Sequence, residues 1–214
     1  MDTHDFVYLI PGNWFELRTI NKSKTQPYDM QMLQDEVLNQ VVTRSEKLSV
    51  INVAYAQTYS SANIEDINIE LTSERFGRIA EFLETESRHP IVTFHGTTKS
   101  NVVDSILSGG YIIPGKENGK GIRAIHGTAY GSGVYSTPHL DKALHYTQRD
   151  TESYVYVLIN LVMMGSAVLL PPTAHKSADS NIDTKIVHGL DQLISTDSSR
   201  IIPIGVMKIK VSRK

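Results

Sequence analysis

The chain has 214 residues, of which 40% are hydrophobic, and this suits one domain with a packed core, or one domain with a smaller attachment. Its formal net charge of −2 shows no excess of basic residues of the kind that nucleic-acid-binding domains carry. It contains no cysteine, which excludes disulfides, thiolate catalysis and cysteine-ligated metals. The N-terminal sequence "MDTHDFVYLIPG" lacks the basic start and long apolar run of a signal peptide, so we expect a cytoplasmic protein.

The N-terminal part of the chain predicts two helices with a strand between them. Residues 1–28 look irregular. Apolar residues recur at helical spacing in Met30–Leu48 and again in Thr72–Glu84, and both segments therefore predict amphipathic helices. The stretch "SVINVAYAQTY", residues 49–59, favours a strand. His89-Pro90 ends the second helix, because the residue before a proline disfavours helical geometry.

From residue 91 the sequence predicts a strand followed by a short helix. Ile91–Phe94 is an apolar run. Ser100 is a suitable N-cap, apolar residues follow it at helical spacing, and Gly109-Gly110 closes the helix. The polar, glycine-rich stretch Pro114–Gly121 predicts a loop.

The C-terminal part predicts short strands and one more helix. Residues 131–135, "GSGVY", lead into a short strand, and Asp141–Thr147 predicts a helix. A polar loop is expected from Pro171 to Asp183, followed by strands near residues 192–196 and 202–211. Many strands with few, short helices indicate a mixed, largely antiparallel α+β domain.

One apolar stretch, Tyr154–Leu170, could be mistaken for a membrane span. It is slightly short for a spanning helix, and Asn160, Gly165 and Ser166 interrupt it. Its β-branched and aromatic residues fit a buried central strand. We therefore predict a strand here and expect no membrane association.

The tripeptide His-Gly-Thr occurs at residues 95–97 and again at residues 126–128. The first copy lies at the end of a predicted strand and before a predicted helix. The second copy lies in a loop before the turn that leads to Tyr135. The first copy is the stronger candidate for a functional site because its surroundings are regular.

Two blocks of the sequence together resemble the catalytic domain of the poly(ADP-ribose) polymerase-like ADP-ribosyltransferases. They are "TFHGTTKSNVVDSILSGG", residues 93–110, and "YGSGVYSTPHLDKALHY", residues 130–146. The resemblance implies the family's split, largely antiparallel β-sheet fold with short flanking helices. It places the catalytic domain at residues 89–214, with residues 1–88 as an N-terminal extension packed on it. The second block is most similar to the mono-ADP-ribosylating branch.

The resemblance implies that NAD is the substrate and that no metal is needed. By this resemblance, His95 should bond the adenosine-side ribose and the backbone of Gly96 should bond the nicotinamide carboxamide. Tyr135 and Tyr146 should hold the nicotinamide ring between them, and residues 114–121 should form a loop over the dinucleotide. The implied NAD-binding positions are His95, Gly96, Thr97, Tyr135, Ala143 and Tyr146.

The third catalytic position, which is a glutamate in members that make polymers, falls on Gln192. A slip of one residue would place Asp191 there and would also turn the other residues of the strand to the opposite face. We favour Gln192. A glutamine can bond a ribose hydroxyl, but it carries no charge and cannot act as a general base. The resemblance thus implies transfer of a single ADP-ribose to a protein acceptor, which could be the chain itself.

The sequence leaves three other functions open. Loss of the glutamate also fits a weak or inactive module that only binds NAD or ADP-ribose. RNA 2′-phosphotransferases share the fold and a His-Gly-Thr block, but the block around Tyr135 argues against them. Arginine-specific toxins use a Glu-x-Glu pair, and Glu84-Thr85-Glu86 matches this pattern. That pair precedes the His-Gly-Thr block, so we expect it to lie at the solvated end of a helix.

Overall fold

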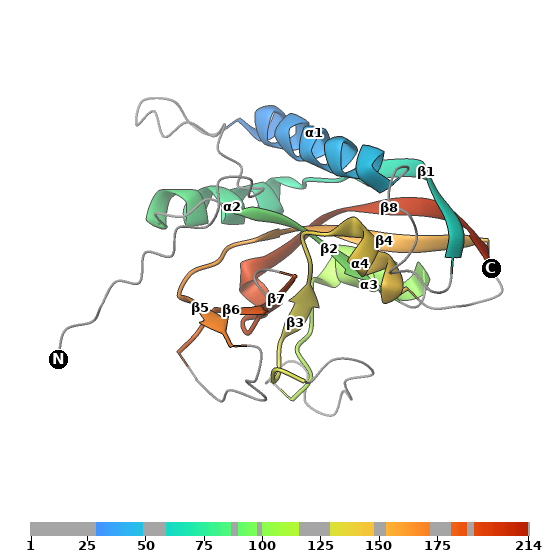
Figure 1. Ribbon diagram of the computed structural model, residues 1–214. Helices are drawn as coiled ribbons and strands as arrows, with labels where there is room; N and C mark the ends of the chain where they lie inside the picture. The colour runs from blue at the N-terminus through green and yellow to red at the C-terminus, as the bar shows by residue number, and fades with distance from the viewer. Residues whose placement is uncertain are drawn as a thin grey trace.

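The computed structural model describes residues 29–48, 59–86, 90–97, 100–115, 129–147, 153–171, 181–187 and 191–213. The helices are α1 Met30–Leu48, α2 Ser73–Thr85, α3 Ser100–Gly109 and α4 Leu140–His145. The strands are β1 Tyr59–Ile69, β2 Ile91–Gly96, β3 Val134–Ser136, β4 Tyr154–Val162, β5 Ala167–Leu170, β6 Thr184–Val187, β7 Gln192–Ser195 and β8 Ile201–Arg213, with a 3₁₀ turn at Ser198–Arg200. Figure 1 shows their arrangement.

The strands form two four-stranded sheets. The first has the order β1-β8-β4-β2 and is antiparallel throughout. The second has the order β3-β7-β6-β5, in which only β5 and β6 run parallel. Phe94 of β2 and Thr137, just after β3, exchange backbone hydrogen bonds of 2.7 and 3.0 Å. This bridge joins the edges of the two sheets, and the α+β split-sheet fold expected from the sequence is confirmed.

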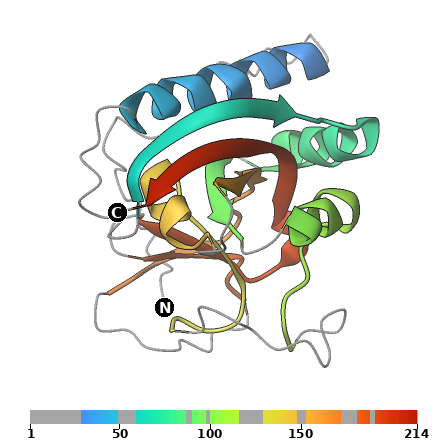
Figure 2. The same ribbon diagram turned by 90° about the vertical axis from the view of Figure 1, so that its right-hand side faces the viewer.

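The first sheet has a core on each of its faces. Helices α1, α2 and α4 pack on one face, against apolar side chains of β2, β4 and β8. Helix α3 packs on the other face, where Val103 lies in a cluster with Leu158 and Ile201. Figures 1 and 2 show α1 and α3 on opposite sides of β8. The sheet is therefore buried on both sides, which explains the near-continuous apolar sequence of β4.

Helix α1 is tied to the strand that carries the first His-Gly-Thr copy. Arg44 is only 5% exposed, and its guanidinium donates a 2.7 Å hydrogen bond to the carbonyl of Val92. The guanidinium also lies over the ring of Phe94, 5.4 Å from the ring centroid. Burial lowers the pKa of Arg44 to about 9. The proposed division of the chain at residue 88 thus separates segments that share one core.

Several predicted elements are confirmed and others need correction. Helices α1 and α2 lie where the periodicity placed them, and Thr72 caps α2 through its side chain. The expected strand at residues 49–59 falls outside the described residues except for Tyr59. Tyr154–Leu170 is two strands rather than one, because the chain turns at Gly165 with a φ of 52° and continues in the second sheet. Strands β1 and β6 were not predicted.

Strand β1 was missed because its apolar alternation is interrupted. Ala62 and Ile64 pack against the core, and so do Ile67 and Ile69, which lie at the opposite parity along the strand. The register with β8 shifts between Ile64 and Asp66. A bulge of this kind resets which residues face the core, so a period of two does not extend through it.

Among the described helices, none combines the length and apolar character needed to cross a bilayer.

Candidate active site

His95 lies at the end of β2, beside the bridge that joins the two sheets. Its Nδ1 is 2.7 Å from the carbonyl oxygen of Tyr135, and its ring meets the Tyr111 ring edge-on with centroids 5.4 Å apart. Burial lowers the pKa of His95, and the hydrogen bond to the Tyr135 carbonyl opposes this shift in part. A carbonyl oxygen only accepts, so Nδ1 carries the proton of the neutral ring. Nε2 is then an acceptor for a ligand hydroxyl.

Packing requires a glycine at position 96. A methyl group at this position would fall on the carbonyl oxygen of Ala143 in α4, and would lie 3.2 Å from the backbone nitrogen of Thr147. The end of β2 therefore approaches the backbone of α4 more closely than any side chain allows. Ala143 itself is buried in the core below this contact. Thr97 follows β2 and is partly buried.

Tyr135 is held by the turn that precedes β3. Its hydroxyl donates to the carbonyl of Gly131 over 2.8 Å and accepts from the backbone N–H of Tyr130 over 3.1 Å. Burial raises the pKa of Tyr135, and the nearby Tyr130 and Tyr146 raise it further, against the hydrogen bond from Tyr130. Gly133 leaves room for Ile194, whose side chain would lie 2.5 Å from a methyl group there. Gly133 thus lets the turn pack closely on β7.

Tyr146 and Gln192 are joined by a hydrogen bond. Tyr146 ends α4 and is 44% exposed, and its hydroxyl accepts a 2.8 Å hydrogen bond from the amide of Gln192. Gln192 is the first residue of β7, two residues before Ile194, which pairs with Tyr135 of β3. Residues two apart on a strand, and residues paired across strands, share a face. Gln192 and Tyr135 therefore lie on the same face of the second sheet.

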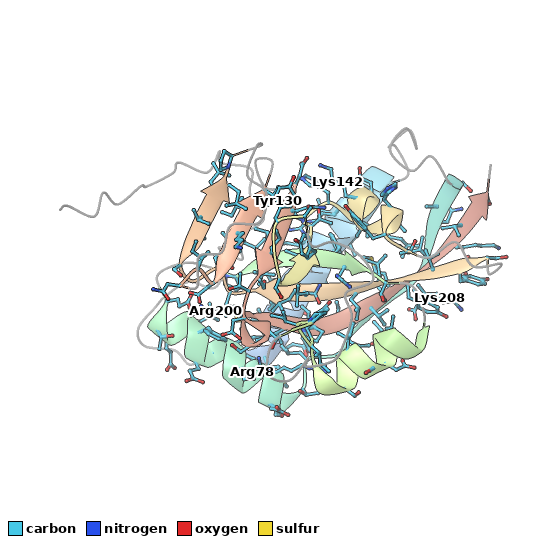
Figure 3. The ribbon with its side chains drawn as sticks, turned by 90° about the horizontal axis from the view of Figure 1, so that it is seen from below. Arg78, Tyr130, Lys142, Arg200 and Lys208 are labelled. Carbon is cyan, nitrogen blue, oxygen red and sulfur yellow. The ribbon has the colours of Figure 1, made fainter. Side chains whose placement is uncertain are left out.

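Asp191 is engaged elsewhere. Its carboxylate forms an ion pair with Lys142 of α4 and lies 3.8 Å from Nε2 of His139. Lys142 and Tyr146 are four residues apart on one side of α4, and they reach the consecutive residues Asp191 and Gln192. Lys142 and Tyr130 are labelled in Figure 3 and lie on the same side of the molecule in that view. Because Asp191 pairs with Lys142 and the Gln192 amide bonds the Tyr146 hydroxyl, the residue in contact with Tyr146 is Gln192 and not Asp191.

Glu86 lies in a separate ionic cluster. It forms an ion pair with Arg200, which also lies 3.2 Å from the carboxylate of Asp183. The N–H of Gly165 donates to the other Glu86 oxygen over 3.2 Å. Glu84 is exposed, but Glu86 is largely shielded, so the expectation that the pair lies at a solvated helix end was wrong for Glu86. The cluster fastens α2 to the turn between β4 and β5.

The structure brings five of the implied site residues to one region. β2 supplies His95 and Gly96, β3 supplies Tyr135, the C-cap of α4 is Tyr146, and β7 supplies Gln192. Most of the loop expected over the dinucleotide and the second His-Gly-Thr copy lie outside the described residues. Sequence reasoning missed the pairing of Lys142 with Asp191 and a buried lysine, Lys185. No motif marks either, because each depends on contacts between separate elements.

The fold is an α+β domain of two bridged sheets, with His95 near the end of one strand, Gln192 at the start of another, and Tyr135 and Tyr146 beside them. A scan against protein-family models matches residues 30–212 to the poly(ADP-ribose) polymerase catalytic domain. The chain belongs to this family, whose substrate is NAD and whose reaction is ADP-ribosyl transfer. A search of curated proteins found no significant match. The match favours this class over an RNA 2′-phosphotransferase.

Proposed function

We propose that the protein is a mono-ADP-ribosyltransferase, which moves one ADP-ribose from NAD to a protein acceptor and releases nicotinamide. The observation that supports this most is the neutral side chain of Gln192, hydrogen-bonded to Tyr146. Its amide nitrogen donates to the phenol, so its amide oxygen can accept a hydrogen bond from the nicotinamide ribose. In this role Gln192 orients the ribose but supplies no negative charge.

Each of the other residues has a role that its contacts allow. Tyr135 and Tyr146 would hold the nicotinamide ring, because rigid aromatic faces bind a flat ring at little entropic cost. The backbone of Gly96 would bond the carboxamide. His95, neutral and with Nε2 free to accept, would bond a hydroxyl of the other ribose. Positioning of this kind brings the reacting carbon and the acceptor together.

Gln192 carries no carboxylate, and this limits the chemistry at that position. As nicotinamide leaves, positive charge moves to the ribose carbon, and a carboxylate about 4 Å away would stabilise it by about 4 kcal/mol at an effective dielectric near 20. Adding a second ADP-ribose also requires a base to activate a ribose hydroxyl. Gln192 supplies neither effect. We therefore propose that the acceptor is a protein, with the chain itself as one candidate, and that transfer ends after one unit.

Incubation with labelled NAD, alone and with cell lysate, tests this proposal. We expect nicotinamide release and acceptor sites that each gain the mass of one ADP-ribose. Mass spectrometry of the modified peptides is the readout, and protein without NAD is the control. A ladder of poly(ADP-ribose) would contradict the argument from charge. Binding of NAD without any transfer would instead support the inactive-module alternative, which is also consistent with a neutral glutamine.

The variant Gln192→Glu tests the mechanism. A carboxylate here would stabilise the transition state more than bound NAD, and only that difference increases the rate. We expect a gain of about 1 kcal/mol, or roughly fivefold, in NAD hydrolysis. The matched control is Asp191→Asn, which removes a half-exposed ion pair and should change the rate less than about twofold. Loss of activity in Asp191→Asn with no gain in Gln192→Glu would show that Asp191 holds the catalytic position.

A further inference from the structure

Lys185 is a buried lysine in the middle of β6. It is only 3% exposed. Strands β5 and β7 flank it, with Val168 on one side and Ile194 on the other. A lysine is almost never buried this fully unless its ammonium has a specific partner, because removing the charge from water is costly. A methionine would fill the same space without that cost, so the presence of an ammonium group here indicates that its charge or its hydrogen bonds have a role.

The register places Lys185 on the face that carries the candidate active site. Lys185 pairs with Ile194, and Ile194 pairs with Tyr135. Paired residues on adjacent strands point to the same side of a sheet. The apolar cluster on this face contains Val187 and Ile194, and both Tyr130 and Tyr135 pack against it. The lysine stem therefore runs along the apolar floor that also supports Tyr135.

A chain of hydrogen bonds leads from the ammonium to the phenol of Tyr135. Nζ of Lys185 donates to the carbonyl of Tyr130 over 3.3 Å. The N–H of Tyr130 donates to the Tyr135 hydroxyl over 3.1 Å, and that hydroxyl donates to the carbonyl of Gly131 over 2.8 Å. One turn, Tyr130-Gly131, is thus held by Lys185 on one side and by Tyr135 on the other.

We propose that Lys185 is a positioning residue for the nicotinamide site, because it anchors the Tyr130-Gly131 turn that sets the angle of the Tyr135 ring. The proposal rests on the proposed function, in which Tyr135 contacts the nicotinamide. Lys185 acts through the turn and touches neither substrate nor reacting atoms. A correctly oriented ring binds substrate and transition state alike, so losing the anchor should weaken binding without slowing the chemical step.

The variants are Lys185→Met, which keeps the stem and removes the donor, and Lys185→Arg, which keeps a charged donor. The probe is benzamide, a flat ring with the carboxamide of nicotinamide, with its Kd measured by calorimetry. Loss of a hydrogen bond from a charged donor should raise the Kd and the KM for NAD about tenfold in Lys185→Met. The kcat for nicotinamide release should stay within about twofold of the parent. Lys185→Arg should recover most of the affinity.

A double mutant tests whether the effect passes through Tyr135. Tyr135→Phe keeps the ring but removes the hydroxyl, and it should raise the benzamide Kd about fivefold. Adding Lys185→Met to Tyr135→Phe should then cost clearly less than Lys185→Met costs alone, because the same connection is already broken. Equal costs in the two backgrounds would overturn the proposal.

The remaining outcomes separate this inference from the proposed function. If the parent binds benzamide and Lys185→Met binds it equally well, the inference fails while the proposed function stands. If the methionine variant does not fold, Tyr135→Phe decides, and an unchanged benzamide Kd in that variant overturns the inference. If the parent binds neither benzamide nor NAD, the proposed function fails and the inference fails with it.

Discussion

Replacing Gly96 by alanine is expected to lower the free energy of unfolding by about 3 kcal/mol, the upper part of the usual range for overpacking. The added methyl group would meet the Ala143 carbonyl well inside van der Waals contact. The carbonyl belongs to the backbone and the methyl carbon is fixed on Cα, so neither can rotate away, and β2 must move from α4. For a domain of this size the melting temperature should fall by about 6–12 °C. Thermal unfolding followed by circular dichroism measures the change.

Gly77→Ala is the matched control. Gly77 lies inside α2, is exposed, and has no atom within 4 Å of the position of an added methyl group. Alanine in a helix interior is better than glycine by about 0.5–1 kcal/mol, so this variant should be more stable than the parent. The same substitution is therefore expected to lower the free energy of unfolding at Gly96 and to raise it at Gly77. An unchanged melting temperature in Gly96→Ala would show that β2 and α4 are not packed as described.

Replacing Tyr146 by alanine is expected to abolish most of the stabilisation that benzamide gives. A ligand present at about 100 times its Kd stabilises the parent by about 2.7 kcal/mol. Loss of one of the two rings that hold the nicotinamide should weaken binding about 100-fold, since it removes apolar contact and stacking. The stabilisation then falls to about 0.4 kcal/mol at the same concentration. Differential scanning fluorimetry with and without benzamide measures this directly.

Two further variants separate the ring from its hydroxyl and from general effects of losing a tyrosine. Tyr146→Phe removes only the hydrogen bond to Gln192 and should keep most of the benzamide shift. Tyr154→Ala removes a ring on β4 that lies under Lys208 of β8, and it should keep the full shift. In Figure 3, Lys208 lies well away from Tyr130 and Lys142. A full shift in Tyr146→Ala would remove Tyr146 from the site.

His95→Ala should affect the two ligands differently. His95 is assigned to the adenosine-side ribose, which NAD has and benzamide lacks. We expect the shift given by NAD to be lost, while the shift given by benzamide is reduced only through the lost hydrogen bond to the Tyr135 carbonyl. Equal losses for both ligands would mean that His95 acts only by holding β3. This comparison therefore tests the role of the side chain as well as its importance.

The sequence by itself determined the elements whose signal is local. Helices α1 and α2 follow from apolar residues at helical spacing, and the end of α3 follows from Gly109-Gly110, where Gly110 has a φ of 78°. The two blocks around His95 and Tyr135 were enough to indicate the family, because they combine residue types with fixed spacing along the chain. These signals lie within short stretches, and no distant contact is needed to read them.

Tertiary structure alone decided the features that depend on which strands meet. The bulge in β1 hid that strand, and four-residue β6 exists because β5 and β7 pair with both of its edges. The contact between Gln192 and Tyr146 joins residues 46 apart in sequence, and the anchor from Lys185 to Tyr130 joins residues 55 apart. The face of a strand residue is set by the register with its neighbours, and a shift of one residue reverses it. The sequence could therefore name Gln192 and Asp191 together, but only the packed sheets place one of them within hydrogen-bond distance of the Tyr146 hydroxyl.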